Sequence, residues 1–503
     1  RSTFDEFRQL VRIDFRLDTS HQGQKSDRTM NSDEMREEIR YSMRVIEQFK
    51  QKKDSISENL VVELLWARYI DSSLIDQKKI DEIQRIINRY LIIKQNYFSS
   101  NTHTKNITWD TMLGLAASEI EETIVSGKKR DALTNFFYHA IRSKIVLTNH
   151  DESYTNIQTF IAAERAFAQS DEPLIEFHLL KLIYPAWFST EHAEDPKVGE
   201  TLMTALEQIQ GHLKDPVSDS LFRFARKQTP AFFLLRDLFL TNDEKIRSAI
   251  EDPTILEQKL AELAHKNYTE TRARVGRAVI RSFIYIFLTK MVFALAIEAP
   301  YDMYIIKHIG YIPLTINMLF PPLLMVVVAG FISVPGSENT TKLIERVKKV
   351  LYHFPSISDE SDGFVPKDLQ RRPLLTAIFS VTYLFTFGAT FILIHLVLAS
   401  LHFTVVSQGI FIFFVALVVF FAYRIRQSTK DYEILNRQGA IEPIFDFLFL
   451  PILRAGQMLS REIARLNILM FLFDFILEAP LKVIFDVVEE WIRFVRIKKE
   501  EIV

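Results

Sequence analysis

The chain has 503 residues, a formal net charge of −2 and no cysteine. This length accommodates two or three domains, and the near-neutral charge lacks the basic excess that general nucleic-acid binders carry. The absence of cysteine excludes disulfides, thiolate nucleophiles and cysteine-ligated metals.

Charged residues are distributed unevenly along the chain. They are scattered up to about Lys266, whereas long stretches between Phe283 and Tyr423 have almost none. A bilayer span needs about 20 consecutive apolar residues, and only the second half offers such runs. We therefore predict an all-α membrane protein with four parts. These are a polar lead segment (1–32), a cytosolic helical domain (33–270), a transmembrane bundle (271–424) and an amphipathic helical tail (425–503).

In the first half, apolar residues recur at helical spacing. Leu60, Val61, Leu64 and Leu65 follow the pattern of an amphipathic helix, and a similar pattern continues from Ile80 to Tyr90. The helix-start signals are Asp215-Pro216, Asp252-Pro253 and a capping box of Thr241 with Glu244. These patterns predict about ten helices between residues 33 and 266.

The soluble half offers little chemistry. Glu176 and His178 are two residues apart, with Glu164 twelve residues before Glu176 and His192 further on. A helical carboxylate–histidine metal motif needs a spacing of three. We interpret the pair as surface charge beside a histidine at a helix end. Glycine-rich phosphate loops, nucleophile elbows and zinc-protease motifs do not occur in the sequence. We predict no catalytic residue, no metal site and no cofactor.

Three apolar runs are long enough to span a membrane, and a fourth, Phe283–Ile297, is short and interrupted by Lys290. The basic residues in successive flanking segments number 4, 1, 7, 0 and 4. Lys and Arg are enriched in cytosolic loops, so this alternation predicts four spans with both termini cytosolic. The loop 335–372 is then cytosolic too. The predicted spans are about 279–298, 311–334, 373–401 and 403–423.

Two segments have the pattern of interfacial helices. In 341–352, an apolar face lies beside Lys342, Arg346 and Lys349, which favours attachment to anionic lipid. Packing of this helix on the cytosolic domain is an equal alternative. In 467–488, acidic residues and Lys482 recur every four positions along an apolar helix. We predict that it lies in the membrane plane, with burial between the bundle and the soluble domain as the alternative.

Ionisable groups within a bilayer are costly and are therefore functional candidates. Lys290, Glu298, Asn317 and His395 are the polar side chains at depth in the predicted spans. They are our candidates for lining a polar pathway or binding a ligand. The alternative is that Lys290 snorkels to the interface, Asn317 bonds a neighbouring helix and His395 lies near the outer interface.

Two classes of function follow from these patterns. The first is a membrane-anchored scaffold whose helical domain recruits an unknown cytosolic protein. The second is a transporter, channel or lipid-handling protein that uses the polar residues of the bundle. An enzyme is the least favoured class. The expected partners are the bilayer with its anionic lipids and a second copy of the chain, and nucleic acid is not expected. The short external loops favour a bacterial plasma membrane.

Overall fold

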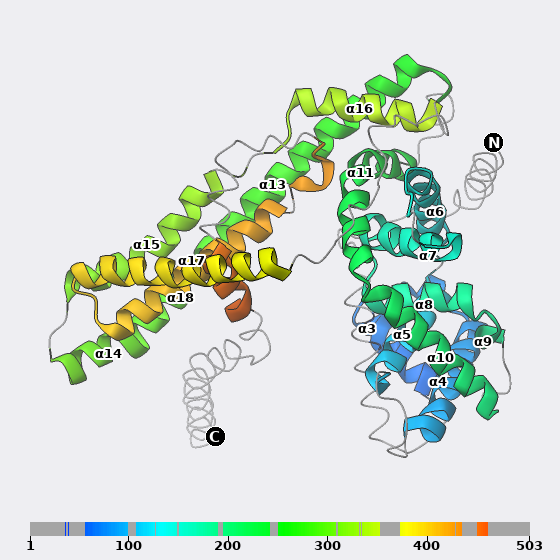
Figure 1. Ribbon diagram of the computed structural model, residues 1–503, viewed down its shortest axis with the longest axis horizontal. Helices are drawn as coiled ribbons and strands as arrows, with labels where there is room; N and C mark the ends of the chain where they lie inside the picture. Colours follow the sequence, from blue (N-terminus) through cyan, green and yellow to red (C-terminus); the bar gives the residue numbers. More distant parts are fainter. Residues whose placement is uncertain are drawn as a thin grey trace, which may run out of the picture. The chain divides into compact units, whose positions relative to one another are not determined.

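The computed structural model describes residues 36, 39, 56–98, 107–125, 127–147, 150–189, 195–241, 250–307, 310–330, 332, 334–352, 373–427, 429–434 and 450–460. The elements formed by these residues are all helices (Figure 1), which confirms the predicted all-α class. The chain divides into two compact units, one of residues 1–261 with 341–369 and the other of residues 262–340 with 370–503.

The first unit is built from amphipathic helices whose starts carry side-chain caps. An aspartate precedes several of them and accepts a hydrogen bond from a backbone N–H of the first turn, as Asp76, Asp171 and Asp215 do. The helices are α3 (Ile56–Trp66), α4 (Gln77–Ile93), α5 (Trp109–Ile124), α6 (Lys128–Arg142), α7 (Glu152–Ala163), α8 (Glu172–Ile183), α9 (Ala186–Ser189), α10 (Pro196–Leu213) and α11 (Pro216–Leu240).

The predicted apolar faces form the core of this unit. Leu60, Val61 and Leu64 of α3 are buried, and so are four of the five apolar positions predicted on α4. At the centre, Tyr90 and Trp187 pack edge to face with ring centroids 5.5 Å apart. The predicted cap Thr241 instead ends α11, and the helix expected after it lies outside the described residues.

The second unit contains the helices expected to cross the membrane. Its elements are the greater part of α13 (Pro253–Phe293), η5 (Ala294–Glu298), α14 (Ala299–Tyr301), η6 (Asp302–Ile306), α15 (Tyr311–Gly330), the first four residues of α16 (Ser337–Tyr352), α17 (Pro373–Ser400), α18 (Val405–Gln427) and η8 (Lys430–Tyr432). The unit boundary falls inside α13, after Ala261, and α16 also contributes residues to both units. From Pro253 to Ile306 the chain is helical without a break.

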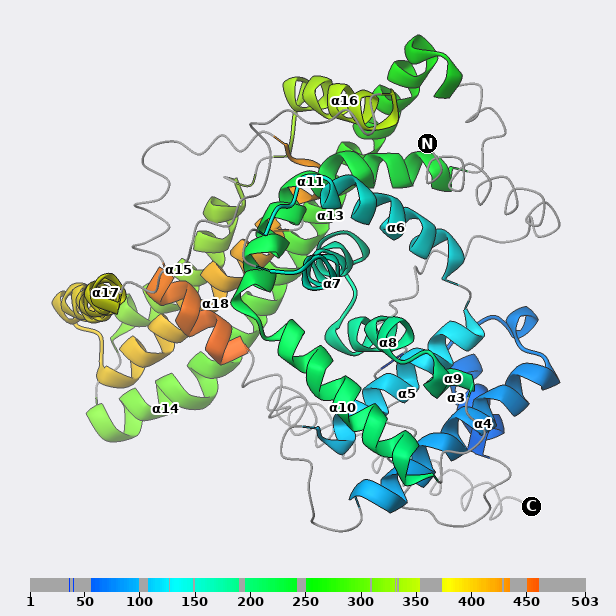
Figure 2. The ribbon, with the colours of Figure 1, turned by 45° about the vertical axis from the view of Figure 1, so that its right-hand side comes forward.

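Ring contacts define the directions of the helices in the second unit. Tyr285 packs against Phe421 and Phe293 against Phe413, so α13 and α18 are antiparallel. Phe320 of α15 packs against Phe411 with centroids 5.2 Å apart. Close to one turn earlier on each helix, Asn317 contacts the backbone of Ser407, so α15 runs parallel to α18. Both ribbon views show α15 and α18 side by side (Figures 1 and 2).

Three helices of the described chain, rather than the four that we predicted, are long and apolar enough to cross a membrane. They are α15, α17 and α18. The predicted span 279–298 is not among them. It contains three charged residues, Arg281, Lys290 and Glu298, and α13 itself ends at Phe293, where a π turn begins. By length and apolar composition, the described chain thus has three candidate spans, as expected of a membrane protein.

The candidate spans differ in how far the protein covers them. About half of the α18 window is buried (56%), whereas only 6% of the α17 window is. Figure 2 shows α17 end-on at the edge of this unit. Helical residues 450–460 pack on α18, where a Cβ added to Gly456 would lie 2.1 Å from the carbonyl oxygen of Ala416. Part of the predicted tail therefore contacts the bundle directly.

Candidate polar site in the helical bundle

Three of the four polar residues predicted at depth meet in one cluster. Lys290 and Glu298 form an ion pair with Nζ 3.6 Å from Oε2, and both residues are 0% exposed. The Lys290 ammonium also lies 5.0 Å from the centre of the Phe414 ring. Lys290 therefore does not snorkel, because protein surrounds its whole side chain.

The π turn places this pair on one helix face. In a regular α-helix, two residues eight positions apart are separated by two full turns and a further rotation of about 80° around the helix axis. A π turn accommodates one additional residue, which changes the offset to roughly 20° in the opposite sense. The turn η5 ends at Glu298, two residues before Pro300. Pro300 has no backbone N–H and cannot complete the α-helical hydrogen bond four residues back, so it favours an irregular turn here.

The second oxygen of Glu298 joins two other helices. Its Oε1 accepts hydrogen bonds from Asn317 Nδ2 at 2.5 Å and from the hydroxyl of Ser407. Asn317 Nδ2 also donates to the Ser407 carbonyl oxygen at 3.2 Å. All three side chains are buried. We did not predict Ser407 from the sequence, although a Ser-Gln pair near the start of an apolar run was a visible signal.

Three polar atoms of the cluster have no hydrogen-bond partner among the described residues. They are Lys290 Nζ, Glu298 Oε2 and Asn317 Oδ1. Buried polar atoms are normally satisfied, and each exception needs an explanation such as a bound solute or a site of proton transfer. The ammonium supplies donors and the two oxygens supply acceptors. The cluster can therefore hold a small polar group or pass a proton between the lysine and the carboxylate.

His395 lies outside this cluster. Its Nδ1 is 2.6 Å from Gln408 Oε1, and Gln408 Nε2 donates to the backbone of Phe403 at 3.0 Å. This contact joins the end of α17 to the start of α18 across the turn at residues 401–404. His402 in that turn has a φ of 63°, the left-handed conformation. The predicted set thus divides into a lysine–glutamate–asparagine cluster and a separate histidine contact.

The predicted membrane-surface residues on α16 have protein contacts. The apolar face of this helix, including Leu343 and Val347, is buried. In the first unit, Arg346 donates to Gln228, and the neighbouring Lys348 pairs with Glu257. The contact of Lys342 and Lys349 with lipid stays a prediction, and Lys482 lies outside the described residues.

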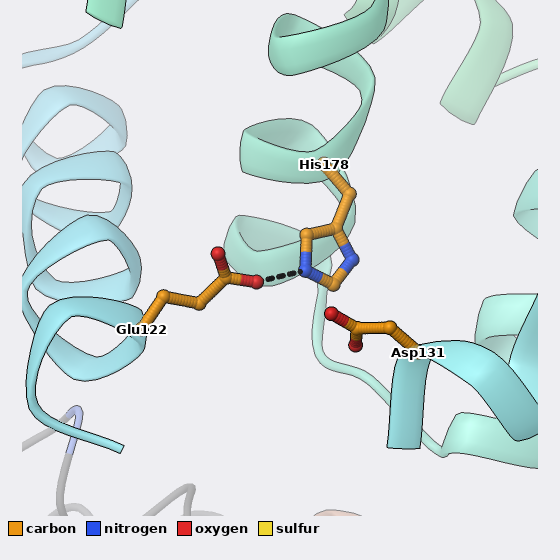
Figure 3. Close-up of side chains that lie close together, drawn as sticks. All are labelled: Glu122, Asp131 and His178. Atoms are coloured by element: carbon orange, nitrogen blue, oxygen red, sulfur yellow. Dashed lines mark hydrogen bonds and ion pairs between the residues drawn. The ribbon is translucent and has the colours of Figure 1, made fainter. Parts of the chain in front are cut away.

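The first unit contains an ion-pair network around His178 (Figure 3). Its Nε2 is 2.8 Å from Glu122 Oε1 and its Nδ1 is 3.3 Å from Glu164 Oε1. Lys181 pairs with the other oxygen of Glu122. Burial opposes a charged imidazole, but the hydrogen bonds and charges of the two glutamates outweigh it and raise the pKa of His178 to about 9.

This network also has the dimensions of a metal site. Ligand atoms of Glu122, Asp131 and His178 lie within 4.8 Å of one another, and Figure 3 shows the three side chains converging. However, both ring nitrogens of His178 are already paired with carboxylates. Lys181 supplies further positive charge next to Glu122. Because two carboxylates share one protonated imidazole, we interpret these residues as an ion-pair network and not as a cation site.

Comparison of the chain with protein-family models, curated proteins and solved structures finds no match in any of the three. The fold therefore defines the class of the chain by itself. The described residues form helices, three of them long and apolar enough to cross a membrane, with a buried, charged cluster between helices of the second unit.

Proposed function

We propose that the chain is a four-span membrane protein whose bundle moves a proton or a small ion through the cluster of Lys290, Glu298 and Asn317. The observation that carries this proposal is that the fully buried cluster contains an ion pair and three polar atoms with no hydrogen-bond partner among the described residues. Burying these groups costs free energy, and a passive membrane anchor gains nothing from a charged pair.

The exposure pattern of residues 282–306 supports a fourth span. The three acidic or basic side chains within this run, Lys290, Glu298 and Asp302, are all buried. The large exposed side chains of the run are apolar or tyrosine, and a lipid environment accepts such a surface. They are Ile284, Leu288, Leu295, Ile297, Met303, Tyr304, Ile305 and Ile306. Two of the three charged residues in the predicted span 279–298, Lys290 and Glu298, are thus enclosed by the bundle.

The helix directions support the predicted topology. Because α13 and α18 are antiparallel, the basic residues before the first span and after the last lie at the same end of the bundle. By the positive-inside rule, that end is cytosolic. We retain the bacterial plasma membrane as the proposed location, on the sequence argument given above.

An anchored interaction protein is the second candidate. The observation that favours it is that Glu298, Asn317 and Ser407 join three helices by hydrogen bonds, which also serves to hold a passive bundle together. In this case the first unit recruits a cytosolic protein partner.

Flux through reconstituted protein separates the two candidates. The full chain in liposomes is compared with the double variant Lys290→Met/Glu298→Gln, in which the new side-chain amide retains an acceptor for Asn317 and Ser407. The matched control, Lys266→Met/Glu270→Gln, makes the same substitutions in an exposed pair on α13. Proton and potassium flux under imposed gradients should fall to the protein-free rate only in the first variant. Equal flux in the wild type and in a folded cluster variant would rule out transport through this cluster.

The fourth span has its own test, because a chain without cysteine allows single-cysteine mapping. Gly276 is exposed with open space around its Cα, so Gly276→Cys is tolerated. A membrane-impermeant maleimide should label Gly276→Cys from the cytosolic side and Lys307→Cys from the opposite side. It should leave Leu288→Cys unlabelled. Labelling of Leu288→Cys in intact vesicles would show that this helix does not cross the bilayer.

A further inference from the structure

Three arginines form a stripe on the outward face of α13. Arg274, Arg277 and Arg281 follow the spacing i, i+3 and i+7, which places them on one side of a helix. All three are exposed, and within the described part of the chain none of them has an ion pair or a hydrogen bond to its side chain. Val275 and Val279, on another side of the helix, pack against the core of the bundle. The stripe therefore points away from the other described helices of the second unit.

The same face changes from basic to apolar within one turn. Ile284 and Leu288 continue the spacing of the stripe, and they are 50% and 45% exposed. Beyond Arg281, the exposed surface of this helix carries no charge before Lys307. From Ile284 to the exposed Tyr304 the helix rises about 30 Å, at about 1.5 Å per residue, which equals the thickness of a hydrocarbon core. Tyrosines commonly mark the membrane–water interface.

A fourth basic residue lies at the same end of the bundle. Arg424 follows Phe421 by less than one helical turn, and Phe421 packs against Tyr285 of α13 with centroids 6.2 Å apart. Arg424 is exposed. Arginine side chains stay charged at every physiological pH and are attracted electrostatically to the phosphate groups of anionic lipids. A set of outward arginines bordering an apolar face matches phosphate groups held at a lipid surface.

We propose that Arg274, Arg277 and Arg281 bind the headgroups of anionic phospholipids and set the membrane boundary between Arg281 and Ile284. This proposal rests on the proposed fourth span. It assigns lipid recognition to α13 rather than to α16, whose apolar face is buried by protein. The attraction is electrostatic and should discriminate anionic from zwitterionic lipids.

The test measures lipid binding to the detergent-solubilised full chain by native mass spectrometry. The two probes are dioleoylphosphatidylglycerol and dioleoylphosphatidylcholine. In the triple variant Arg274→Gln/Arg277→Gln/Arg281→Gln, affinity for the anionic lipid should fall by on the order of a hundredfold, at about fivefold for each arginine. The corresponding Arg→Lys triple variant should keep most of the affinity.

The control variant removes the same charge from exposed positions elsewhere, Lys78→Gln/Arg85→Gln/Lys227→Gln, and should bind both lipids as the wild type does. An arginine-to-glutamine variant with wild-type affinity for the anionic lipid would overturn the proposal. Equal loss in the lysine and glutamine variants would overturn it too, because charge would then not be the cause. If residues 282–306 do not cross the bilayer, the maleimide labels Leu288→Cys in vesicles. This result is independent of the lipid-binding measurement.

Discussion

Lys290 faces one oxygen of Glu298 while the other oxygen of the same carboxylate accepts hydrogen bonds from two further helices. The Nζ–Oε2 distance is 3.6 Å, beyond ordinary hydrogen-bond length, whereas Asn317 Nδ2 approaches Oε1 to 2.5 Å. The carboxylate is therefore held firmly from one side and paired loosely on the other. The contacts that join the three helices therefore involve Oε1 of Glu298, whereas the ion pair with Lys290 involves Oε2.

Removing one partner of the pair should destabilise the bundle more than removing both. Lys290→Met leaves a buried carboxylate uncompensated and Glu298→Gln leaves a buried ammonium, each at a cost of about 3–5 kcal/mol. The double variant has no buried charge and should regain most of that loss. Thermal unfolding of all four proteins in detergent gives the coupling free energy. Additive effects of the two substitutions would mean that the groups do not interact.

The sequence predicted that the polar residues of the cluster lie deep within the spans, but not how they contact one another. Lys290, Glu298 and Asn317 were recognisable as polar residues in apolar runs. The shared face of Lys290 and Glu298 depends on a π turn whose register no periodicity shows. The mean hydropathy of a segment does not show which charged side chains face the interior of the bundle. The first span was therefore predicted from the basic residues of the loops and not from hydropathy.

The His178 network shows a different limit of sequence reasoning. The prediction considered Glu176, two residues away, and excluded it as a helical metal partner by its spacing. The actual partners, Glu122 and Glu164, lie 56 and 14 residues earlier and reach the ring through helix packing. Local spacing carries no information about such contacts, whereas amphipathic helices such as α4 follow directly from it.

Gly456 should tolerate no side chain. A Cβ at this position would lie 2.1 Å from the carbonyl oxygen of Ala416, and backbone atoms do not move aside at low cost. Gly456→Ala should therefore destabilise the protein by about 1–3 kcal/mol. Gly409→Ala in α18 is the control, because a Cβ there meets open space. Thermal melts in detergent should show a loss for the first variant only. Equal melting temperatures would show that residues 450–460 do not pack closely on α18.

Asn339 joins three segments of the second unit. Its Nδ2 donates to the Tyr268 hydroxyl at 2.9 Å and to the Tyr432 carbonyl oxygen at 2.7 Å. Its Oδ1 accepts from the Ile434 backbone N–H at 2.8 Å. Asn339→Asp keeps the shape but replaces the donating amide with a buried acceptor.

This change should cost on the order of 2 kcal/mol or more, because two acceptors lose their donor and a carboxylate is buried. Asn88→Asp, at an exposed asparagine of α4, should change stability by less than about 0.5 kcal/mol. Unfolding curves of both variants provide the comparison. A stable Asn339→Asp variant would mean that these bonds do not fasten α16 to α13 and η8.

His178 should make stability fall at alkaline pH. Its pKa rises from 6.5 in the unfolded chain to about 9 in the folded protein, despite the opposing effect of burial. A raised pKa means that the folded state holds the proton more tightly. Its contribution is therefore fully present below about pH 6.5 and is lost as the pH rises through about 9. The full contribution is on the order of 3 kcal/mol, taking about 1.4 kcal/mol for each pKa unit.

Glu122 should make the stability of the protein fall at acid pH. Burial raises its pKa, but hydrogen bonds from His178 and Lys181 outweigh burial and lower the pKa to about 2. Its contribution is present above about pH 4.5 and is lost as the pH falls through about 2.

Chemical denaturation between pH 6 and 9.5 measures the contribution of His178 separately from that of Glu122. His178→Gln should flatten the decline across this window, whereas His150→Gln, at an exposed histidine, should keep the wild-type profile. A wild-type decline that persists unchanged in His178→Gln would assign the alkaline loss to other groups.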